Sequence, residues 1–189
     1  MVHTLAMETA LGPHTWEEFI SLDEDDLREL IDGELVEVEV PKRAHEHAVM
    51  KLGRYLDEWG DEHEGTRVYP SGYKIRIGPK HGVMPDLQVY LASNKPRPED
   101  EEGLLTGRPD LVVEIISPSS IRYDRIVKLG YYAKIRVPEY WIVDPDVQTI
   151  ERLVLKKGSY AIEQTATGKQ HFRPKSFDGL DIPLAKLWL

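Results

Sequence analysis

The segment that decides the fold reads PDLVVEIISPSS and covers residues 109–120. Its residues from Leu111 to Ile116 are apolar except one, and a short apolar run of this kind is typical of a strand buried on both faces. The exception is Glu114 in the middle of the run. An ionised carboxylate in an apolar layer is costly unless it is paired, protonated or bound to a metal. We therefore expect Glu114 to be paired, protonated or bound to a metal.

The residues that follow this strand predict a crossover unit. Pro118-Ser119-Ser120 breaks the strand and supplies an N-cap for a helix over about 121–136, which Val137-Pro138 ends. A second apolar strand follows over 139–143. A strand, a helix and a strand in this order imply a parallel pair, so the strand with Glu114 should be central in its sheet.

The rest of the chain adds helices and strands around this unit. The patterns predict one or two short acidic helices over 15–31, with capping-box spacing at Thr15–Glu18 and Ser21–Glu24, and a long helix over 42–64. Further strands are expected at 34–40, 73–77, 86–91, 149–155 and 159–165, with an exposed connection over 94–108 and a short helix in the tail, 177–189. We therefore expect an α/β (α+β) fold, a central mixed sheet flanked by helices with additional strands.

The composition predicts one ordinary globular domain over residues 1–189. The chain is 41% hydrophobic and 30% charged, and no apolar run approaches the length of a membrane helix. The first residues show no signal-peptide pattern. There is no cysteine, which excludes disulfides, thiolate zinc sites and cysteine nucleophiles. We expect a cytoplasmic protein without a membrane partner.

The charge distribution leaves two interpretations open. A net charge of −9 argues against nucleic acid, because phosphate binding requires Lys and Arg. Basic residues nevertheless outnumber acids within 67–80 and within 121–136, whereas 17–29, 57–64 and 99–102 are acidic. The chain has either a basic patch on an acidic body or scattered solvated charges.

Two carboxylates predict a candidate metal site. Asp86 follows Pro85 at the start of one expected strand, and Glu114 lies within a later one. If the strands are neighbours, both acids can bind Mg²⁺, or alternatively Mn²⁺, which takes one or two carboxylates, waters and a substrate phosphate. The alternative is a buried salt bridge between Glu114 and Arg125 or Lys128.

The spacing of Pro85-Asp86 and Glu114 resembles the PD-(D/E)xK nuclease signature, in which a lysine stands two residues after the second acid. Period two puts both side chains on one face of the strand, so the lysine can orient or activate the metal-bound water. Here Ile116 occupies the lysine position. A substitute could come from Lys128 on the following helix or from Lys74 on a neighbouring strand.

Four motifs in order resemble the Uma-two family, whose members are commonly described as restriction endonucleases. They are ELIDGELVEV (29–38), MPDLQVY (84–90), RPDLVVEIISPSS with RYDRIVKLGYYA (108–133) and VPEYWIVDPD (137–146), within about residues 15–155. The resemblance implies a restriction-endonuclease-like core over 15–155, with C-terminal strands and a tail over 156–189. It also implies a Mg²⁺-dependent site with Asp86 and Glu114 as the acids and Lys128 as a lysine migrated to the helix. Asp124 and Tyr132 match further helix positions of the family.

Other polar residues have weaker claims to the site. His45 could touch a phosphate or position the site, and Glu34 or Glu46 could approach the metal. Asp110 forms a second Pro-Asp pair, but it lies about 13 Å from Glu114 along an extended strand, too far to share a metal. Trp141 and Tyr140 are expected in the core, and Asp144 as a turn cap.

These observations support rival functions. The first is an endonuclease that hydrolyses DNA, with Asp86, Glu114 and Lys128 as catalytic residues and Arg122 and Arg125 facing the phosphates. The second is a nucleic-acid-binding or protein-interaction module that no longer cleaves, and the third is a structural dimer piece with a paired Glu114. A homodimer is a further expectation, because nucleases that cut both strands often act in pairs.

Overall fold

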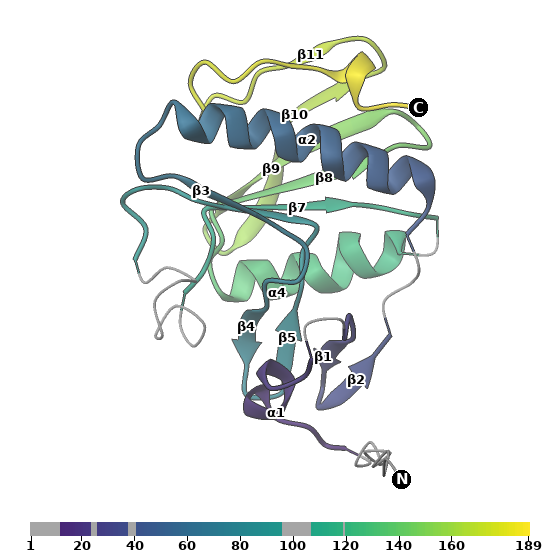
Figure 1. The fold of residues 1–189 in the computed structure, drawn as a ribbon, viewed down its shortest axis with the longest axis vertical. Helices are drawn as coiled ribbons and strands as arrows, with labels where there is room; N and C mark the ends of the chain where they lie inside the picture. Colours follow the sequence, from purple (N-terminus) through teal and green to yellow (C-terminus); the bar gives the residue numbers. More distant parts are fainter. Residues whose placement is uncertain (1–11, 24–25, 38–40, 96–106, 119) are drawn as a thin grey trace, which may run out of the picture.

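A six-stranded mixed sheet forms the centre of the molecule in the computed structural model, which describes residues 12–23, 26–37, 41–95, 107–118 and 120–189 (Figure 1). The strand order is β10-β9-β8-β7-β6-β3. The strands are β3 (Arg67–Pro70), β6 (Leu87–Tyr90), β7 (Leu111–Ile115), β8 (Glu139–Asp144), β9 (Thr149–Lys156) and β10 (Ser159–Thr167). The strands β7 and β8 are parallel, and the other neighbouring pairs are antiparallel. The predicted central strand and parallel pair are confirmed.

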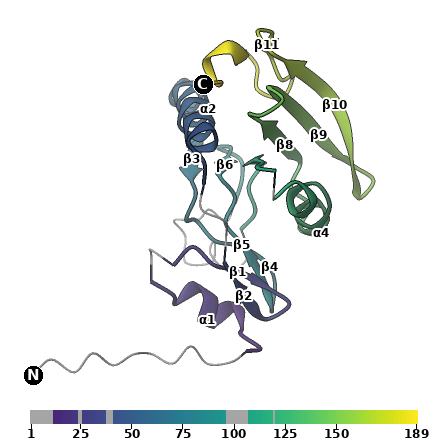
Figure 2. The ribbon, with the colours of Figure 1, turned by 90° about the vertical axis from the view of Figure 1, so that its right-hand side faces the viewer.

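Two helical layers cover opposite faces of this sheet (Figure 2). The crossover between β7 and β8 consists of the π-helix η1 (Tyr123–Lys128) and α4 (Leu129–Lys134). The long helix α2 (Arg43–Asp61) lies on the other face. The side chains of β7 alternate accordingly, because Val113 and Ile115 belong to the core cluster of α2, whereas Val112 and Ile116 pack in the cluster of α4.

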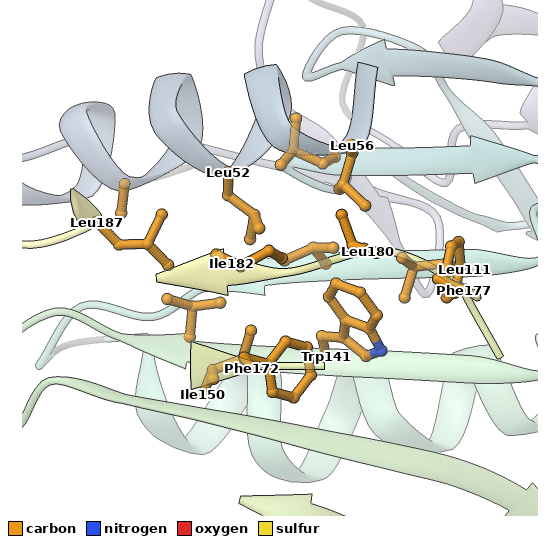
Figure 3. Packing of buried hydrophobic residues seen from close by; sticks show 14 of the residues in the cluster. Leu52, Leu56, Leu111, Trp141, Ile150, Phe172, Phe177, Leu180, Ile182 and Leu187 are labelled. Carbon is orange, nitrogen blue, oxygen red and sulfur yellow. The ribbon is translucent and has the colours of Figure 1, made fainter. Parts of the chain in front are cut away.

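The C-terminal segment completes the core on the α2 face. It contains the strands β11 (His171–Phe172) and β12 (Ile182–Pro183), followed by the 3₁₀ turn η2 (Leu184–Lys186). Figure 3 shows its apolar side chains packed between α2 and the sheet, with Phe172 beside Trp141 and with Ile182 and Leu187 in the same cluster. The tail helix expected over 177–189 is thus reduced to one 3₁₀ turn.

A second, four-stranded sheet lies beside the helix-flanked core, in the order β2-β1-β5-β4. Its strands are β1 (Glu29–Ile31), β2 (Glu34–Val36), β4 (Ile75–Gly78) and β5 (His81–Val83). The short helix α1 (Trp16–Ile20) begins with the predicted capping box at Thr15 and packs on this sheet. Gly82 permits that contact, since a Cβ there would stand 2.6 Å from the Phe19 ring.

The prediction of helix up to residue 31 is wrong. Asp32 and Gly33 adopt φ values of 54° and 85°, which reverse the chain and pair Glu29–Ile31 with Glu34–Val36 as a hairpin. Residues 21–23 form no helix, so the second capping-box prediction also fails there, and residues 24–25 lie outside the described residues. Long-range pairing of β1 with β5 thus prevails over the local helix signals.

The predicted fold class is confirmed, and the structure adds strands that were not predicted, β1, β3, β5, β11 and β12. Residues 38–40 of the expected strand 34–40 and residues 96–106 of the expected connection lie outside the described residues. The single domain over 1–189 stays a prediction. Within the described ranges, no helix is long and apolar enough to span a bilayer.

Candidate active site

The two predicted acids meet at one end of the β6–β7 pair. Asp86 directly precedes β6, and the antiparallel register places Leu87 opposite Val113, one residue before Glu114. The Ile115 N–H donates to Asp86 Oδ2 at 2.7 Å, which fixes the aspartate beside the strand that carries the glutamate. Both acids line one cavity of about 300 Å³.

Glu114 points toward the crossover helix and is buried there. Its Oε1 accepts a hydrogen bond from the Tyr132 hydroxyl at 2.6 Å and lies 3.0 Å from the Lys128 ammonium. Ile116, on the same face of the strand, is buried in the apolar cluster that contains Tyr132. Core packing therefore fills the position where the nuclease signature has a lysine.

Lys128 reaches the site from the π-helical turn η1. Its side chain is 6% exposed, and its Nζ lies 3.4 Å from Glu29 Oε1 and 3.5 Å from Asp124 Oδ1 as well as beside Glu114. A π-helical turn inside a longer helix is often found at functional sites, because it changes the direction of the side chains around it. Glu114 therefore forms the expected buried ion pair with Lys128. Arg125, the other expected partner, pairs with Glu151 instead.

Lys74, the other candidate for the missing lysine, lies elsewhere. Its Nζ donates to the Phe19 carbonyl at 2.8 Å and stands 4.9 Å from the centre of the Phe19 ring. Burial lowers the pKa of Lys74. Lys74 therefore anchors α1, and Lys128 is the lysine at the acids.

The electrostatics of the cluster are unbalanced toward negative charge. Burial, with the nearby carboxylates of Asp124, Asp86 and Glu29, raises the pKa of Glu114 well above its usual value, although Lys128 opposes this. Burial alone would lower the pKa of Lys128, but Glu114, Glu29, Asp124 and Asp86 together raise it well above its usual value. The ammonium of Lys128 is thus shared among four acids. A further cation would be attracted to this cavity.

His45 brings an imidazole to the acids from the start of α2. Its Nε2 lies 3.3 Å from Asp86 Oδ2 and its Nδ1 3.1 Å from Glu46 Oε1. Burial works against its charge, but Asp86 and Glu46 raise the pKa of His45 overall. His45 therefore lies beside Asp86, and both of its expected roles, contact with a phosphate and positioning of the site, stay predictions. Glu46 is exposed, and Glu34, also exposed, does not line the cavity.

Glu29 is the site residue that the sequence did not reveal. It begins β1, is 2% exposed, and accepts the Met84 N–H through Oε1 at 2.9 Å and the Tyr123 hydroxyl through Oε2 at 2.8 Å. A signal was available, because the Asp32-Gly33 turn favours a hairpin in which Glu29 would start a strand. The expected helix concealed it.

The remaining candidates have structural surroundings. Asp110 accepts the Leu91 N–H at 2.7 Å and a hydrogen bond from the Asn94 amide at 2.9 Å, so the second Pro-Asp pair braces a loop as its distance from Glu114 suggested. Trp141 and Tyr140 are fully buried, and Asp144 accepts two turn N–H groups, all as predicted. Arg122 is exposed near the start of the crossover helix.

The donor set fits a hard divalent cation that shares its coordination with substrate. Within the described ranges, no three His, Asp or Glu side chains are grouped so that they alone could hold a metal. Asp86 and Glu114 supply two carboxylates, which suffices for Mg²⁺, since this ion keeps several waters and binds substrate phosphate.

Comparison with known proteins gives a consistent result. The family model Uma2, described as "putative restriction endonuclease", matches residues 16–185. An uncharacterized protein of Synechocystis sp., sll1609, is 25% identical over 126 residues, which are 65% of this chain and 69% of that protein. A crystal structure of a "putative nuclease belonging to DUF820" from Anabaena variabilis has a TM-score of 0.71 at 21% identity, covering 92% of this chain and 96% of the other. The structural likeness shows a shared fold.

Proposed function

This chain belongs to the Uma2 family of "putative restriction endonucleases", and from this premise we propose that it is a metal-dependent endonuclease that hydrolyses phosphodiester bonds of DNA. One observation carries the proposal. Asp86 and Glu114, from neighbouring strands, line the same cavity as Lys128, whose Nζ is 3.0 Å from Glu114. Two acids and a lysine at one point could hold a cation and orient its bound water, which is the arrangement of metal-assisted hydrolysis in the PD-(D/E)xK signature.

Asp86 and Glu114 would hold the cation, Mg²⁺ or Mn²⁺. Bound there, such an ion polarises the phosphate and lowers the pKa of a water molecule. In the free protein Asp86 already accepts a hydrogen bond through Oδ2 and Glu114 through Oε1, so both carboxylates are held in place beside the cavity where they would bind the ion.

The protein groups around the acids have separate tasks in this proposal. Lys128 orients the attacking water and balances the negative charge that develops on the phosphate. The Tyr132 hydroxyl fixes the rotamer of Glu114, and His45 does the same for Asp86. Ile116 occupies the lysine position of the signature and packs in the apolar core. Among the described residues, Lys128 is the lysine that lies beside Glu114.

A second candidate function is a binding module on a nuclease scaffold that no longer cleaves. Two observations favour it, the pairing of Glu114 with Lys128 and the presence of Ile116 where the nuclease signature has a lysine. Such a module would bind DNA without metal and tolerate Asp86→Asn.

Cleavage of supercoiled plasmid in Mg²⁺ or Mn²⁺ tests the proposal. The wild-type protein should nick the plasmid, and Asp86→Asn, Glu114→Gln and Lys128→Gln should each slow nicking at least about 1000-fold, to a residual rate measured at high protein concentration, while the proteins stay folded. Asp110→Asn is the matched control, since it changes the other Pro-Asp pair outside the cavity. Its nicking rate per folded molecule should equal that of the wild type.

The outcomes separate the candidates. Metal-dependent nicking lost in the three site variants and kept in Asp110→Asn supports the endonuclease. Metal-independent DNA binding by a folded wild type that nicks neither plasmid nor single strands supports the module. Cutting of both strands at one place would further support our proposal of a homodimer, which sedimentation in the presence of DNA tests directly.

A further inference from the structure

The buried cluster contains an acid that neither the nuclease signature nor the proposed mechanism uses. Glu29 comes from the four-stranded sheet, outside the helix-flanked core that supplies Asp86, Glu114 and Lys128. It lies 3.4 Å from Lys128 Nζ through an oxygen that also accepts the Met84 N–H. Its other oxygen accepts the Tyr123 hydroxyl. Burying a further acid in this cluster without a task would cost stability.

The hydrogen bonds of Glu29 occupy both of its oxygens and connect it to the lysine. Both of its oxygens are engaged within the protein, by Met84 and Lys128 on one side and by Tyr123 on the other. Tyr123 belongs to η1 with Lys128, and its ring centre lies 5.3 Å from Lys128 Nζ. Met84 stands two residues before Asp86. Glu29 thus ties the helical turn that carries the lysine to the segment that leads into the first acid.

Lys128 needs an anchor besides Glu114, because Glu114 both pairs with Lys128 and is a proposed metal ligand. In the free protein Glu114 is the nearest acid to Lys128, at 3.0 Å. A cation on Glu114 would draw electron density from that carboxylate and weaken its hold on the ammonium. Glu29 and Asp124, at 3.4 and 3.5 Å, remain as anchors for Lys128.

On these grounds, and resting on the endonuclease function proposed above, we propose that Glu29 is a positioning residue that holds Lys128 in place when Glu114 binds the metal. Glu29 acts through Lys128 and contacts neither metal nor substrate. The four-stranded sheet is then part of the active site, because β1 presents Glu29 and the end of β5 presents Met84 to it.

Steady-state nicking by Glu29→Gln tests this role, since glutamine keeps an acceptor for Tyr123 and removes the charge. The kcat should fall about 10- to 100-fold, a range typical of residues that orient a metal-site group, and Glu29→Asp should restore part of it. The KM for plasmid and the Mg²⁺ concentration at half-maximal rate should stay within about twofold. Combined with Lys128→Gln, the Glu29→Gln change should cost no further rate, because groups that act as a unit are not additive.

Glu139→Gln is the matched control, a buried glutamate paired with Arg152 away from the cavity. It should alter stability and leave kcat of the folded protein unchanged. A kcat for Glu29→Gln within twofold of the wild type, or a full additional loss on top of Lys128→Gln, would overturn the proposal. A tenfold rise in the Mg²⁺ requirement would instead make Glu29 a ligand.

A second measurement is independent of cleavage, so it distinguishes failure of this inference from failure of the endonuclease proposal. The ¹⁵N resonance of an ammonium held by carboxylates should be visible for Lys128 in the wild type with and without Mg²⁺. In Glu29→Gln it should broaden when Mg²⁺ is added. Identical spectra of wild type and Glu29→Gln in Mg²⁺ would refute the positioning role even if the wild type nicks plasmid.

Discussion

The neighbouring parallel strands β7 and β8 each bury a glutamate, and the two acids have opposite surroundings. Glu139 on β8 is matched by a single base, Arg152, which donates from Nε at 2.9 Å and from a second guanidinium nitrogen. Trp141 Nε1 also donates to it, and Arg152 is further bonded to Ser176. Glu114 on β7 shares one lysine with other acids and borders a cavity.

The difference shows how a buried charge can be assigned to structure or to function. A charge that is paired one to one, with its remaining hydrogen bonds satisfied and no cavity beside it, has no capacity for a ligand. An acidic cluster with one ammonium beside a cavity has that capacity, because a cation would relieve the repulsion among its carboxylates. Burial alone does not distinguish the two glutamates, since both are nearly inaccessible to solvent.

The largest expected effect contrasts the two glutamates in catalysis. Glu114→Gln should slow plasmid nicking at least about 1000-fold, equivalent to about 4 kcal/mol in the activation barrier, because it removes a proposed metal ligand. Glu139→Gln should change the rate per folded molecule less than about twofold, a limit set by the absence of any task in the chemistry. Equal losses of nicking rate in both variants would show that the different surroundings of the two glutamates do not separate a catalytic residue from a structural one.

The next effect reverses the comparison in stability. Glu139→Ala leaves Arg152 buried without its carboxylate, and removal of one partner of a buried pair typically costs about 3–5 kcal/mol. Glu114→Gln should cost less than about 1 kcal/mol, since it relieves repulsion from neighbouring acids while Lys128 keeps other partners. Urea unfolding of both variants in metal-free buffer measures this, and a larger loss for Glu114→Gln would contradict it.

A smaller effect concerns the metal itself. Mg²⁺ at 100 times its dissociation constant should stabilise the wild type by about 2.7 kcal/mol, because it binds the folded state alone. Asp86→Asn should lose this stabilisation, and Glu139→Gln should keep it. Thermal unfolding with and without Mg²⁺ measures the difference, and an unchanged response of Asp86→Asn would remove Asp86 from the metal site.

The smallest effect provides a baseline from a pair nearer the surface. Arg125, on the same helical turn as Lys128, pairs with Glu151 at a partly exposed position. Arg125→Ala should lower the free energy of unfolding by no more than about 1 kcal/mol, as is usual for such pairs. Chemical denaturation measures it. A loss of stability as large as that of Glu139→Ala would mean that solvent exposure does not explain why the two ion pairs differ in strength.

The sequence predicted the parts of the molecule in which local pattern and tertiary structure agree. The apolar run around Glu114, the crossover helix and the stripe of α2 were predicted because burial imposes their periodicity. Asp86, Glu114 and Lys128 do converge at one place, although their roles stay a prediction. The Asp32-Gly33 turn was a local signal for the strand that carries Glu29, but the pairing of that strand with β5, about fifty residues away, is encoded by no local pattern. The π-helical turn was likewise not predictable from spacing.

The placement of Ile116 and Lys128 has a consequence for when the protein can act. A lysine beside Glu114 on the strand would be present as soon as the strand forms, whereas Lys128 meets Glu114 only once the helix docks on the sheet through Tyr132 and its apolar neighbours. A newly synthesised or partly melted chain that has formed every helix and strand still lacks the assembled site until they pack together. The proposed cutting activity would therefore be withheld from the cell's own DNA until folding is complete.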